Sequence, residues 1–447
     1  MADPVRDACV RLLLDVEKQI PLSGPLEVAQ SRLEPAARAR LRSLVTEAVR
    51  HRARIDHVVS GFLSKGSVSS LHPPIRQILR AAGAEHLVLQ STSPHALVNG
   101  WVEIARRYGH KGTAGLVNAV LRRLTREGAA KWAAIESADA HGKGRAFRTL
   151  AQHWSVLYSH PAWLVERWIG AWGEDRVRAI LEWNQRTPDY WLRLAPGVAP
   201  GSDVLPEGHE AGWIPGAVRV EAGSRPHEEA AFGEGGYTVQ DGSGIVVGLL
   251  APDPHGLVLD LCAAPGTKTG HLLERGGERI RVLAADRSPG RLRRMRRGLQ
   301  RLGREHQVHL VACDGRVPGW GTAPFSGALV DAPCTNLGVV RRRPDVRWRV
   351  TEDEVDRLRA VQAGLLDAAA AGVAPGGWLV YSVCTIDPAE TLEQRAAFLS
   401  RNPGFRPVPL PEWVPAGARR DEGEMLLLPG EFETDGGYAF VMRKDAR

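Results

Sequence analysis

The sequence predicts an α + α/β protein, with an N-terminal all-α bundle, a small linking module and a C-terminal domain built around a parallel sheet. Three observations predict this organisation. Apolar residues recur at helical spacing in residues 1–140, tryptophan, glycine and proline accumulate in 145–235, and short apolar runs alternate with amphipathic stretches in 236–447. We therefore expect domain boundaries near residues 140 and 236.

The N-terminal region has the pattern of packed helices. In "LRSLVTEAVRHRARIDHVVSGFL", residues 41–63, apolar side chains follow one another three or four positions apart, as on the buried stripe of a helix. We therefore expect a helical bundle. Its expected core positions in this stretch are Leu41, Leu44, Val45, Ala48, Val49, Ile55, Val58, Val59 and Phe62.

The linking module has two parts that differ in amino-acid composition. It begins with the tryptophan-bearing "HPAWLVERWIGAWGEDRVRAILEWNQRTPDYWLRLAP" and continues with the glycine- and proline-rich "PGVAPGSDVLPEGHEAGWIPG". The tryptophan-bearing part predicts a few helices, and the glycine- and proline-rich part predicts a small sheet or a loop module. The pattern does not fix the fold of this region.

The C-terminal region alternates strand-like and helical patterns. Its apolar runs are "LVLDL", "RVLAAD", "VHLVACD", "GALVDAPC" and "WLVYSVCT". Such alternation is typical of a parallel sheet with helices on both faces. Between the last two runs, Thr351 and Glu354 form a candidate capping box at the start of a long helix, and "APGG" ends that helix.

Whole-chain properties narrow the class of protein. A formal net charge of +7 and a pI near 9.4 favour a polyanionic partner. The N-terminal stretch has acids among its apolar residues, unlike a signal peptide, and no run reaches the roughly 18 apolar residues of a membrane span. The 5 cysteines never form CxxC, which argues against a disulfide framework and a zinc site. We expect a cytoplasmic protein without bound metal or membrane contact.

Residues that follow the apolar runs lie at the carboxyl edge of the expected sheet, where such sheets bind ligands. The first run leads into "CAAPGTKTGHL", a small-residue loop that can bring backbone N–H groups to a carboxylate or phosphate. Asp286 follows the second run, 20 residues beyond Gly266, at the distance expected of an acid that binds a ribose, and Asp314 after the third run is placed to bind an adenine amino group. The loop matches neither GxGxxG nor GxxxxGK[ST], which leaves S-adenosyl-L-methionine as the expected cofactor.

Cys334 and Cys384 follow the fourth and fifth runs. A thiolate that adds to carbon 6 of a pyrimidine makes carbon 5 nucleophilic enough to accept a methyl group. Asp331, three residues before Cys334, can hydrogen-bond to or protonate the ring nitrogen. Because an ordinary thiol titrates near about 8.5, we expect Lys268 and nearby arginines to lower the pKa. Chemistry alone does not say which thiol attacks.

Several stretches resemble the motifs of RNA 5-methylcytosine methyltransferases. "VLDLCAAPGTKT", "DAPCTNLGVVRRRPDVRW" and "YSVCTIDPAE" are similar to motifs of the bacterial Fmu/Sun (RsmB-like) group, which modifies 16S ribosomal RNA. In the N-terminal region, "SPHALVNGWVEIARRYGHKGTAGLVNAVLRRL" resembles the NusB-type helical RNA-binding domain. The resemblance covers nearly the whole chain, least distinctly over 145–235. It implies a NusB-like bundle and a Rossmann-like methyltransferase domain that depends on S-adenosyl-L-methionine.

Carried over by position, the resemblance implies that Cys384 attacks carbon 6 of a cytosine and that Cys334 assists release. It places Asp331 between the cofactor and the base. The implied cofactor contacts are Cys262, Ala263, Ala264, Pro265, Gly266, Thr267, Lys268, Asp286, Asp314 and Asp331.

The chain departs from the group's pattern at three places. The group has Gly-Gly-Lys where this chain has Gly-Thr-Lys at 266–268, so the backbone approaches the cofactor less closely. Thr335 and Asn336 replace Ser-Gly, and Val383 replaces Thr before Cys384. None of these changes removes a reacting group, so they bear on cofactor affinity and on the fit of the base.

The segment "RRRPDVRW" follows Cys334 closely and offers groups that grip phosphate and stack on a splayed base. We expect RNA contacts from Arg341, Arg342, Arg343 and Trp348, and from the linking module. The expected partner is 16S rRNA or a small-subunit assembly intermediate, bound by a monomer.

Two other functions compete with this interpretation. A ribosome-assembly or antitermination factor with a vestigial catalytic domain would bind RNA without chemistry, and the intact Cys384, Cys334 and Asp331 speak against it. A DNA or transfer-RNA methyltransferase, or a second RNA target, would keep the same chemistry and is left open by the sequence.

Overall fold

A computed structural model describes residues 3–138, 147–317, 319 and 324–446. The chain forms two compact units: unit 1 comprises Met1–Gln185 with Arg343–Arg349, and unit 2 comprises Arg186–Arg342 with Val350–Arg447. The first unit therefore extends past the boundary expected near residue 140, and it includes seven residues that are distant in sequence.

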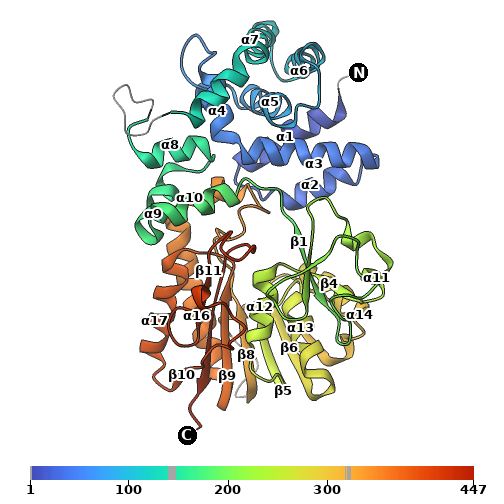
Figure 1. Ribbon diagram of the computed structural model, residues 1–447, viewed down its shortest axis with the longest axis vertical. Coiled ribbons are helices and arrows are strands. Elements are labelled where there is room, and N and C mark those ends of the chain that lie inside the picture. The colour runs from blue at the N-terminus through green and yellow to red at the C-terminus, as the bar shows by residue number, and fades with distance from the viewer. Residues whose placement is uncertain (1–2, 139–146, 318, 320–323, 447) are drawn as a thin grey trace. The chain divides into compact units, whose positions relative to one another are not determined.

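Unit 1 consists of helices (Figure 1). All nine core positions expected between Leu41 and Phe62 are buried, which confirms the helical interpretation of that stretch. Proline occupies the first turn of several of these helices, where its missing N–H costs no hydrogen bond. The helices are α1 (Pro4–Glu17), α2 (Ser23–Gln30), α3 (Pro35–Arg50), α4 (Arg52–Ser60), η1 (Val68–Ser70), α5 (Pro73–Gly83), η2 (Ala84–Leu89), α6 (Pro94–Tyr108), α7 (Lys111–Glu136), α8 (Leu150–Leu157), α9 (Ala162–Trp172), α10 (Glu174–Trp183) and α15 (Val346–Arg349).

The linking region contributes to both units. Its helices α8, α9 and α10 belong to unit 1, and its strands belong to a four-stranded antiparallel sheet of unit 2 with the order β2-β3-β1-β4. The few helices expected there are present, and so are three strands of the small sheet, whose fourth strand, β4, lies just beyond residue 235. The strands are β1 (Tyr190–Leu194), β2 (Glu210–Ala211), β3 (Ala217–Val220) and β4 (Tyr237–Val239), followed after β3 by η3 (Pro226–Glu228) and α11 (Ala230–Gly233).

The larger sheet of unit 2 has the strand order β10-β12-β9-β8-β5-β6-β7, with β11 paired to β12. Strands β5 to β9 are parallel, as the five apolar runs predict. The chain winds from β5 outward in one direction and then returns to β8 on the other side, so the carboxyl ends of β5 and β8 flank a switch point, where such sheets bind ligands. The parallel strands are β5 (Gly256–Leu261), β6 (Ile280–Asp286), β7 (Val308–Ala312), β8 (Phe325–Asp331) and β9 (Val373–Val383); the antiparallel ones are β10 (Phe405–Pro407), β11 (Glu424–Leu427) and β12 (Gly437–Lys444).

Helices flank the larger sheet on both sides in Figure 1, with α16 and α17 on one side and α12, α13 and α14 on the other. Thr351 caps α16 by accepting the Glu354 N–H at 3.3 Å, as expected, while the Glu354 carboxylate pairs with Arg357 at 2.7 Å. The helices are α12 (Gly242–Leu250), α13 (Thr267–Gly276), α14 (Pro289–Arg301), α16 (Glu352–Gly372) and α17 (Leu392–Arg401), and the short ones are η4 (Gly277–Arg279), η5 (Glu305–Gln307), η6 (Pro388–Glu390) and η7 (Ala416–Ala418).

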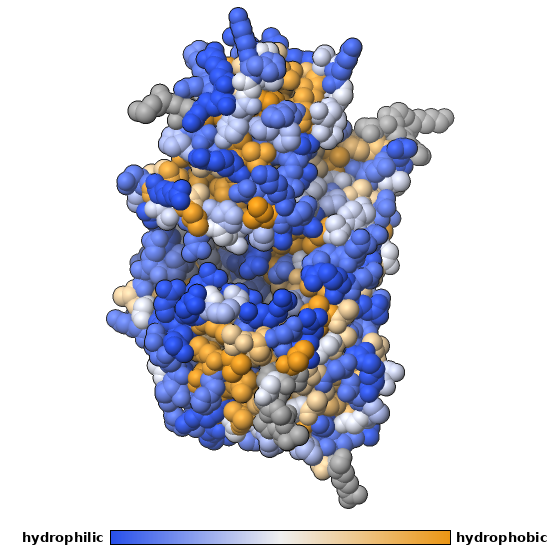
Figure 2. All heavy atoms as spheres, turned by 180° about the vertical axis from the view of Figure 1, so that it is seen from behind, coloured by the Kyte–Doolittle hydropathy of each residue, from blue (hydrophilic) through white to orange (hydrophobic). Residues whose placement is uncertain are grey.

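The surface seen in Figure 2 is mainly hydrophilic, and its apolar areas are separate from one another. Few large apolar side chains are exposed among the described residues; they are Ile20, Val28, Val204 and Val317. Within the described ranges, no helix is both long and apolar enough to cross a membrane.

Candidate active site

The two thiols predicted from the sequence meet at the carboxyl edge of the larger sheet. Cys334 follows β8, Cys384 follows the neighbouring strand β9, and their Sγ atoms are 3.4 Å apart. The two loops are also joined through their backbones, because Ala332 N donates to Ser382 O at 2.9 Å and Gly338 N donates to Cys384 O at 3.1 Å. We call Cys334 and Cys384 the thiol pair.

An ion pair between Lys268 and Asp331 lies beside the thiol pair. Lys268 Nζ contacts Asp331 Oδ2 at 2.7 Å, and Ser382 Oγ donates to Asp331 Oδ1 at 2.7 Å. Burial opposes the charge of Lys268, but the Asp331 carboxylate outweighs it and raises the pKa of the lysine, and Cys384 acts in the same direction. Lys268 therefore remains a cation next to both the carboxylate and the thiol pair.

The thiol pair differs from expectation in its electrostatics. The hydrogen bond with Cys384 and burial together raise the pKa of Cys334 well above its ordinary value. The expected lowering by nearby cations is therefore wrong for this thiol, because burial and the sulfur–sulfur contact outweigh them. Cys334 is buried, whereas Cys384 is partly exposed, so Cys384 is the more accessible thiol.

A buried polar cluster behind the thiol pair was not predicted from the sequence. Glu390, at the end of η6, accepts the Thr335 N–H at 3.0 Å, the Gln362 amide at 2.9 Å and the Thr335 hydroxyl. Thr335 Oγ1 also lies 2.8 Å from Thr385 Oγ1. Burial raises the pKa of Glu390. The cluster joins the residue after Cys334 to the residue after Cys384, and the only signal for it in the sequence is a glutamate six residues beyond Cys384.

The predicted loop Cys262–Lys268, here called the cofactor loop, connects β5 to α13. Gly266 has a φ of 97°, and a Cβ there would lie 2.6 Å from Met295 Cγ, so the turn requires glycine for both conformation and space. Asp286, at the end of β6, accepts from Ala264 N at 3.3 Å and Ser288 N at 2.8 Å. The loop and the acid are thus fixed to each other.

The three predicted cofactor elements line one cavity of about 40 Å³. Cys262, Asp286 and Asp314 reach it from the ends of β5, β6 and β7, and Val361 and Leu365 of α16 give it an apolar wall. Carboxylates that accept from hydroxyl and amino groups, beside an apolar wall, are the kinds of group that bind an adenosine, although the cavity itself is smaller than that ligand. The Asp314 carboxylate accepts hydrogen bonds from Arg316, which lower its pKa to about 2, so this acceptor is ionised at neutral pH.

The expected RNA-contacting side chains differ in their exposure: Arg341 is buried, Arg342 and Trp348 are half-buried, and Arg343 is exposed. Arg341, 2% exposed, pairs with Asp189 at 2.6 Å and Asp435 at 2.9 Å, and Arg342 pairs with the same Asp435. Trp348 belongs to unit 1, where its indole N–H donates to Val49 O at 2.9 Å. Of the four residues, only Arg343 is exposed.

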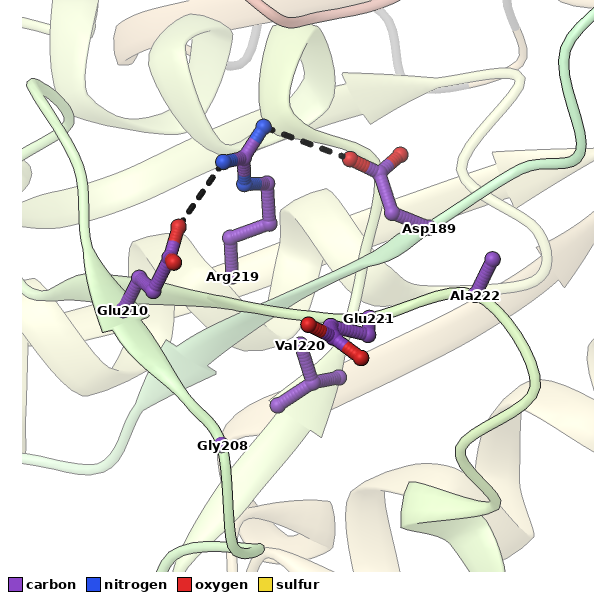
Figure 3. Close-up of a pocket in the computed structure, with 7 residues that line it drawn as sticks. All are labelled: Asp189, Gly208, Glu210, Arg219, Val220, Glu221 and Ala222. Carbon is purple, nitrogen blue, oxygen red and sulfur yellow. Dashed lines mark hydrogen bonds and ion pairs between the residues drawn. The ribbon is translucent and has the colours of Figure 1, made fainter.

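A separate cavity of about 370 Å³ lies against the smaller sheet (Figure 3). Arg219 stands between Glu210, at 2.9 Å, and Asp189, at 3.7 Å, and Glu221 adds a third carboxylate. Carboxylates outnumber the cation, so the cavity does not suit a phosphate. Among the described residues, no group of three or more His, Cys, Asp or Glu side chains is arranged to hold a metal ion.

Three family models match separate parts of the chain. Residues 247–443 match the family described as 16S rRNA methyltransferase RsmB/F, residues 3–126 match the NusB family, and residues 160–199 match the RsmF/B-like methyltransferase ferredoxin-like domain. The probable ribosomal RNA small subunit methyltransferase B of Bacillus subtilis (strain 168) is 31% identical, with 98% of each chain covered. Ribosomal RNA small subunit methyltransferase B of Vibrio vulnificus (strain YJ016) is 32% identical over 99% of this chain and 100% of its own.

Two solved structures share the fold. The crystal structure of PH0851 covers 99% of this chain and 99% of its own, with a TM-score of 0.79 and 24% identity. A methyltransferase homolog protein from Pyrococcus horikoshii covers 66% of this chain and 98% of its own, with a TM-score of 0.56 and 23% identity.

Proposed function

Because the chain belongs to the 16S rRNA methyltransferase RsmB/F family, we propose that it transfers the methyl group of S-adenosyl-L-methionine to carbon 5 of a cytosine in 16S rRNA through a covalent Cys384–cytosine intermediate. The observation that carries the proposal is the thiol pair, with sulfur atoms 3.4 Å apart, beside the Lys268–Asp331 ion pair. A methyltransferase that acts on an oxygen or an amine has no need of two thiols at that point, whereas carbon 5 of a pyrimidine requires a nucleophile at carbon 6.

The cofactor loop, Asp286 and Asp314 would hold the cofactor, which supplies an electrophilic methyl group when bound. The Cys384 sulfur adds to carbon 6, and the nearby Lys268 ammonium favours the thiolate that this addition needs. Asp331 is held by Lys268 and Ser382 and faces the ring nitrogen in this proposal. Negative charge collects on that nitrogen, and only the protonated form of Asp331 can donate to it, so Asp331 carries a proton at this step. After transfer, a base removes the proton from carbon 5, the electrons of that C–H bond re-form the ring double bond, and Cys384 leaves carbon 6 as a thiolate. Cys334 lies close enough to the Cys384 sulfur to assist this release.

Unit 1, with its NusB-type helices, and the exposed arginines of α14 are the proposed contacts with RNA phosphates, together with Arg343. On α14, Leu292, Met295 and Leu299 are buried, which leaves Arg293, Arg294 and Arg297 exposed. The proposed partner is 16S rRNA or a small-subunit assembly intermediate in the cytoplasm.

The test combines two measurements. Bisulfite sequencing of 16S rRNA from strains with and without the gene should show one or more cytosines whose protection depends on the gene. The purified protein should then methylate that rRNA when S-adenosyl-L-methionine is supplied. Unmethylated rRNA in both assays would leave the chain an RNA-binding factor and overturn the proposal.

Replacing each cysteine of the thiol pair with alanine should have a different effect on the reaction. Cys384→Ala should abolish methyl transfer and any covalent protein–RNA adduct, because no bond to carbon 6 forms. Cys334→Ala should transfer the methyl group but accumulate an adduct that survives denaturing electrophoresis. Cys313→Ala, which removes a partly exposed thiol outside the pair, is the control and should form no lasting adduct at saturating cofactor. Methylation intact in both pair variants would refute the covalent mechanism.

A further inference from the structure

We infer that Asn336 is a further catalytic residue, whose amide oxygen accepts the S–H of Cys384 and orients this thiol for attack. The inference rests on the proposed function, in which Cys384 is the nucleophile. Cys384 Sγ lies 3.2 Å from Asn336 Oδ1, within hydrogen-bonding distance for sulfur.

The backbone fixes Asn336 relative to Cys384. Asn336 has a φ of 59°, in the left-handed region that asparagine and glycine adopt more readily than other residues. Its carbonyl accepts from Val339 N at 3.1 Å, which closes a tight turn, and Gly338 within that turn donates to Cys384 O at 3.1 Å. The turn is therefore tied to the main chain of the residue whose side chain Asn336 contacts.

The orientation of the Asn336 amide follows from its second contact. Asn336 Nδ2 donates to Cys334 O at 2.7 Å, and a carbonyl oxygen can only accept a hydrogen bond. The NH2 group must therefore face Cys334, and the amide oxygen must face Cys384. One side chain thus joins the main chain of one thiol residue to the sulfur of the other.

An amide oxygen next to a sulfur favours the thiol over the thiolate, because it accepts from S–H and has no proton to donate to S⁻. The titratable groups around Cys384 act in both directions. The Lys268 ammonium and the S–H of Cys334, which its raised pKa keeps protonated, favour the thiolate, whereas the Asp331 carboxylate disfavours it. Asn336 adds an uncharged hydrogen-bond acceptor, which fixes the orientation of the Cys384 side chain until the cytosine binds. Substitution of Asn336 can separate its effect on the ionisation of the Cys384 thiol from its effect on the orientation of that side chain.

Asn336→Gly is the informative variant. Glycine accepts the left-handed backbone, so the turn is retained while the acceptor is lost. Removing a hydrogen bond to the neutral thiol should raise the thiolate fraction of Cys384 about two- to tenfold at neutral pH. Losing the orientation should lower kcat about ten- to a hundredfold. The two effects have opposite signs. Because an unfolded chain would also expose Cys384 and lose turnover, the melting curve of the variant is measured alongside and should match that of the wild type.

The experiment uses the full chain and follows Cys384 itself. Alkylation by iodoacetamide is measured over a pH series, with the modified peptide identified by mass spectrometry, and kcat and KM for methyl transfer are measured on the same preparations. Asn336→Gly should alkylate faster at neutral pH, with a lower pH midpoint, and should show reduced kcat at nearly unchanged KM for RNA. Asn336→Asp should alkylate more slowly than the wild type, because a carboxylate disfavours the thiolate.

Glu433→Gly is the matched control, because Glu433 is also a non-glycine residue with positive φ, 54°, in unit 2, and its side chain is exposed and pairs with Arg219. It should leave both measurements unchanged. An active wild type whose Cys384 alkylates at the same rate as in Asn336→Gly would overturn the inference alone. A wild type that methylates no cytosine would overturn the proposed function, and the catalytic role of Asn336 with it.

Discussion

Replacing Arg347 with methionine should destabilise unit 1, although Arg347 lies in a segment that follows the thiol loop of unit 2. Arg347 is 0% exposed and donates to the carbonyls of Ser159 at 3.0 Å, Asn184 at 3.2 Å and Tyr158 at 3.3 Å. Tyr158 O keeps two other donors, His160 and Gln185, so its loss is small. The carbonyls of Ser159 and Asn184 lose this buried donor.

The magnitude follows from two opposing effects. Leaving two buried carbonyls without this donor costs about 2–6 kcal/mol, at about 1–3 kcal/mol each. Burial also lowers the pKa of Arg347 well below its ordinary value, which means that the buried cation itself costs stability, and methionine recovers about 1–4 kcal/mol of that cost. The expected net loss is about 2 kcal/mol, or about 4–8 °C in Tm for a unit of this size.

Differential scanning calorimetry of the full chain measures the Tm, and hydrogen exchange over α8, α9 and α10 assigns the change to unit 1. Arg343→Met is the control: Arg343 belongs to the same short segment but is exposed, and its replacement should shift Tm by less than about 1 °C. Equal melting temperatures for the two variants would refute the reasoning. A more stable Arg347→Met would show that the buried charge costs more than its hydrogen bonds return.

Three further predictions concern the larger sheet of unit 2, where Asp260 is a buried residue of β5, and the residues that follow its strands. Asp286→Ala should weaken S-adenosyl-L-methionine binding about ten- to a hundredfold, because two ribose hydroxyls lose a side-chain acceptor; an unchanged affinity measured by calorimetry would contradict the assignment. Burial raises the pKa of Asp260 to about 7 from an ordinary 3.8, so the folded state keeps a proton that the unfolded chain has released between those values, and wild-type stability should fall as pH rises through that window. Asp260→Asn cannot ionise, so urea unfolding at several pH values should show its stability relative to the wild type rising from about pH 4 to about pH 7 and level above, and a constant difference would contradict this. Glu390→Ala should lower kcat more than Glu390→Gln, which keeps one acceptor for the Thr335 N–H and the Gln362 amide; equal rates would mean that this cluster does not position the thiol loops.

Local patterns predicted the larger elements well because each is specified by neighbouring residues. The stripe from Leu41 to Phe62 is buried because three-and-four spacing places those side chains on one side of a helix. The five apolar runs became β5 to β9 because both faces of a parallel sheet are covered. The sequence did not predict strand β12. Its sequence "GYAFVMRK" is as apolar as the other strands, but no local pattern indicates that it pairs antiparallel with β9.

The meeting of the predicted site residues at one edge followed from strand order, whereas their individual partners did not. Parallel strands end together, so Asp331, Cys334 and Cys384 had to lie near one another once β8 and β9 were adjacent. The contact of Cys384 with Asn336 depends on a left-handed backbone and on the direction of one amide, and neither leaves a periodic signal.

Arginine shows most clearly where reasoning from composition stops. A guanidinium fits a carboxylate and a phosphate equally well, so "RRRPDVRW" indicates an anion without saying which one. Arg341 meets carboxylates that lie 152 and 94 residues away in the sequence, and Arg347 meets carbonyls of unit 1, so neither is offered to a ligand. On α14 the helical period determines which side chains are exposed. Leu292, Met295 and Leu299 are buried, so the arginines between them face outward, and local sequence alone predicts this exposure. An arginine cluster is therefore stronger evidence for RNA binding when a helix dictates its exposure than when it lies in a loop that can fold back on acids of its own chain.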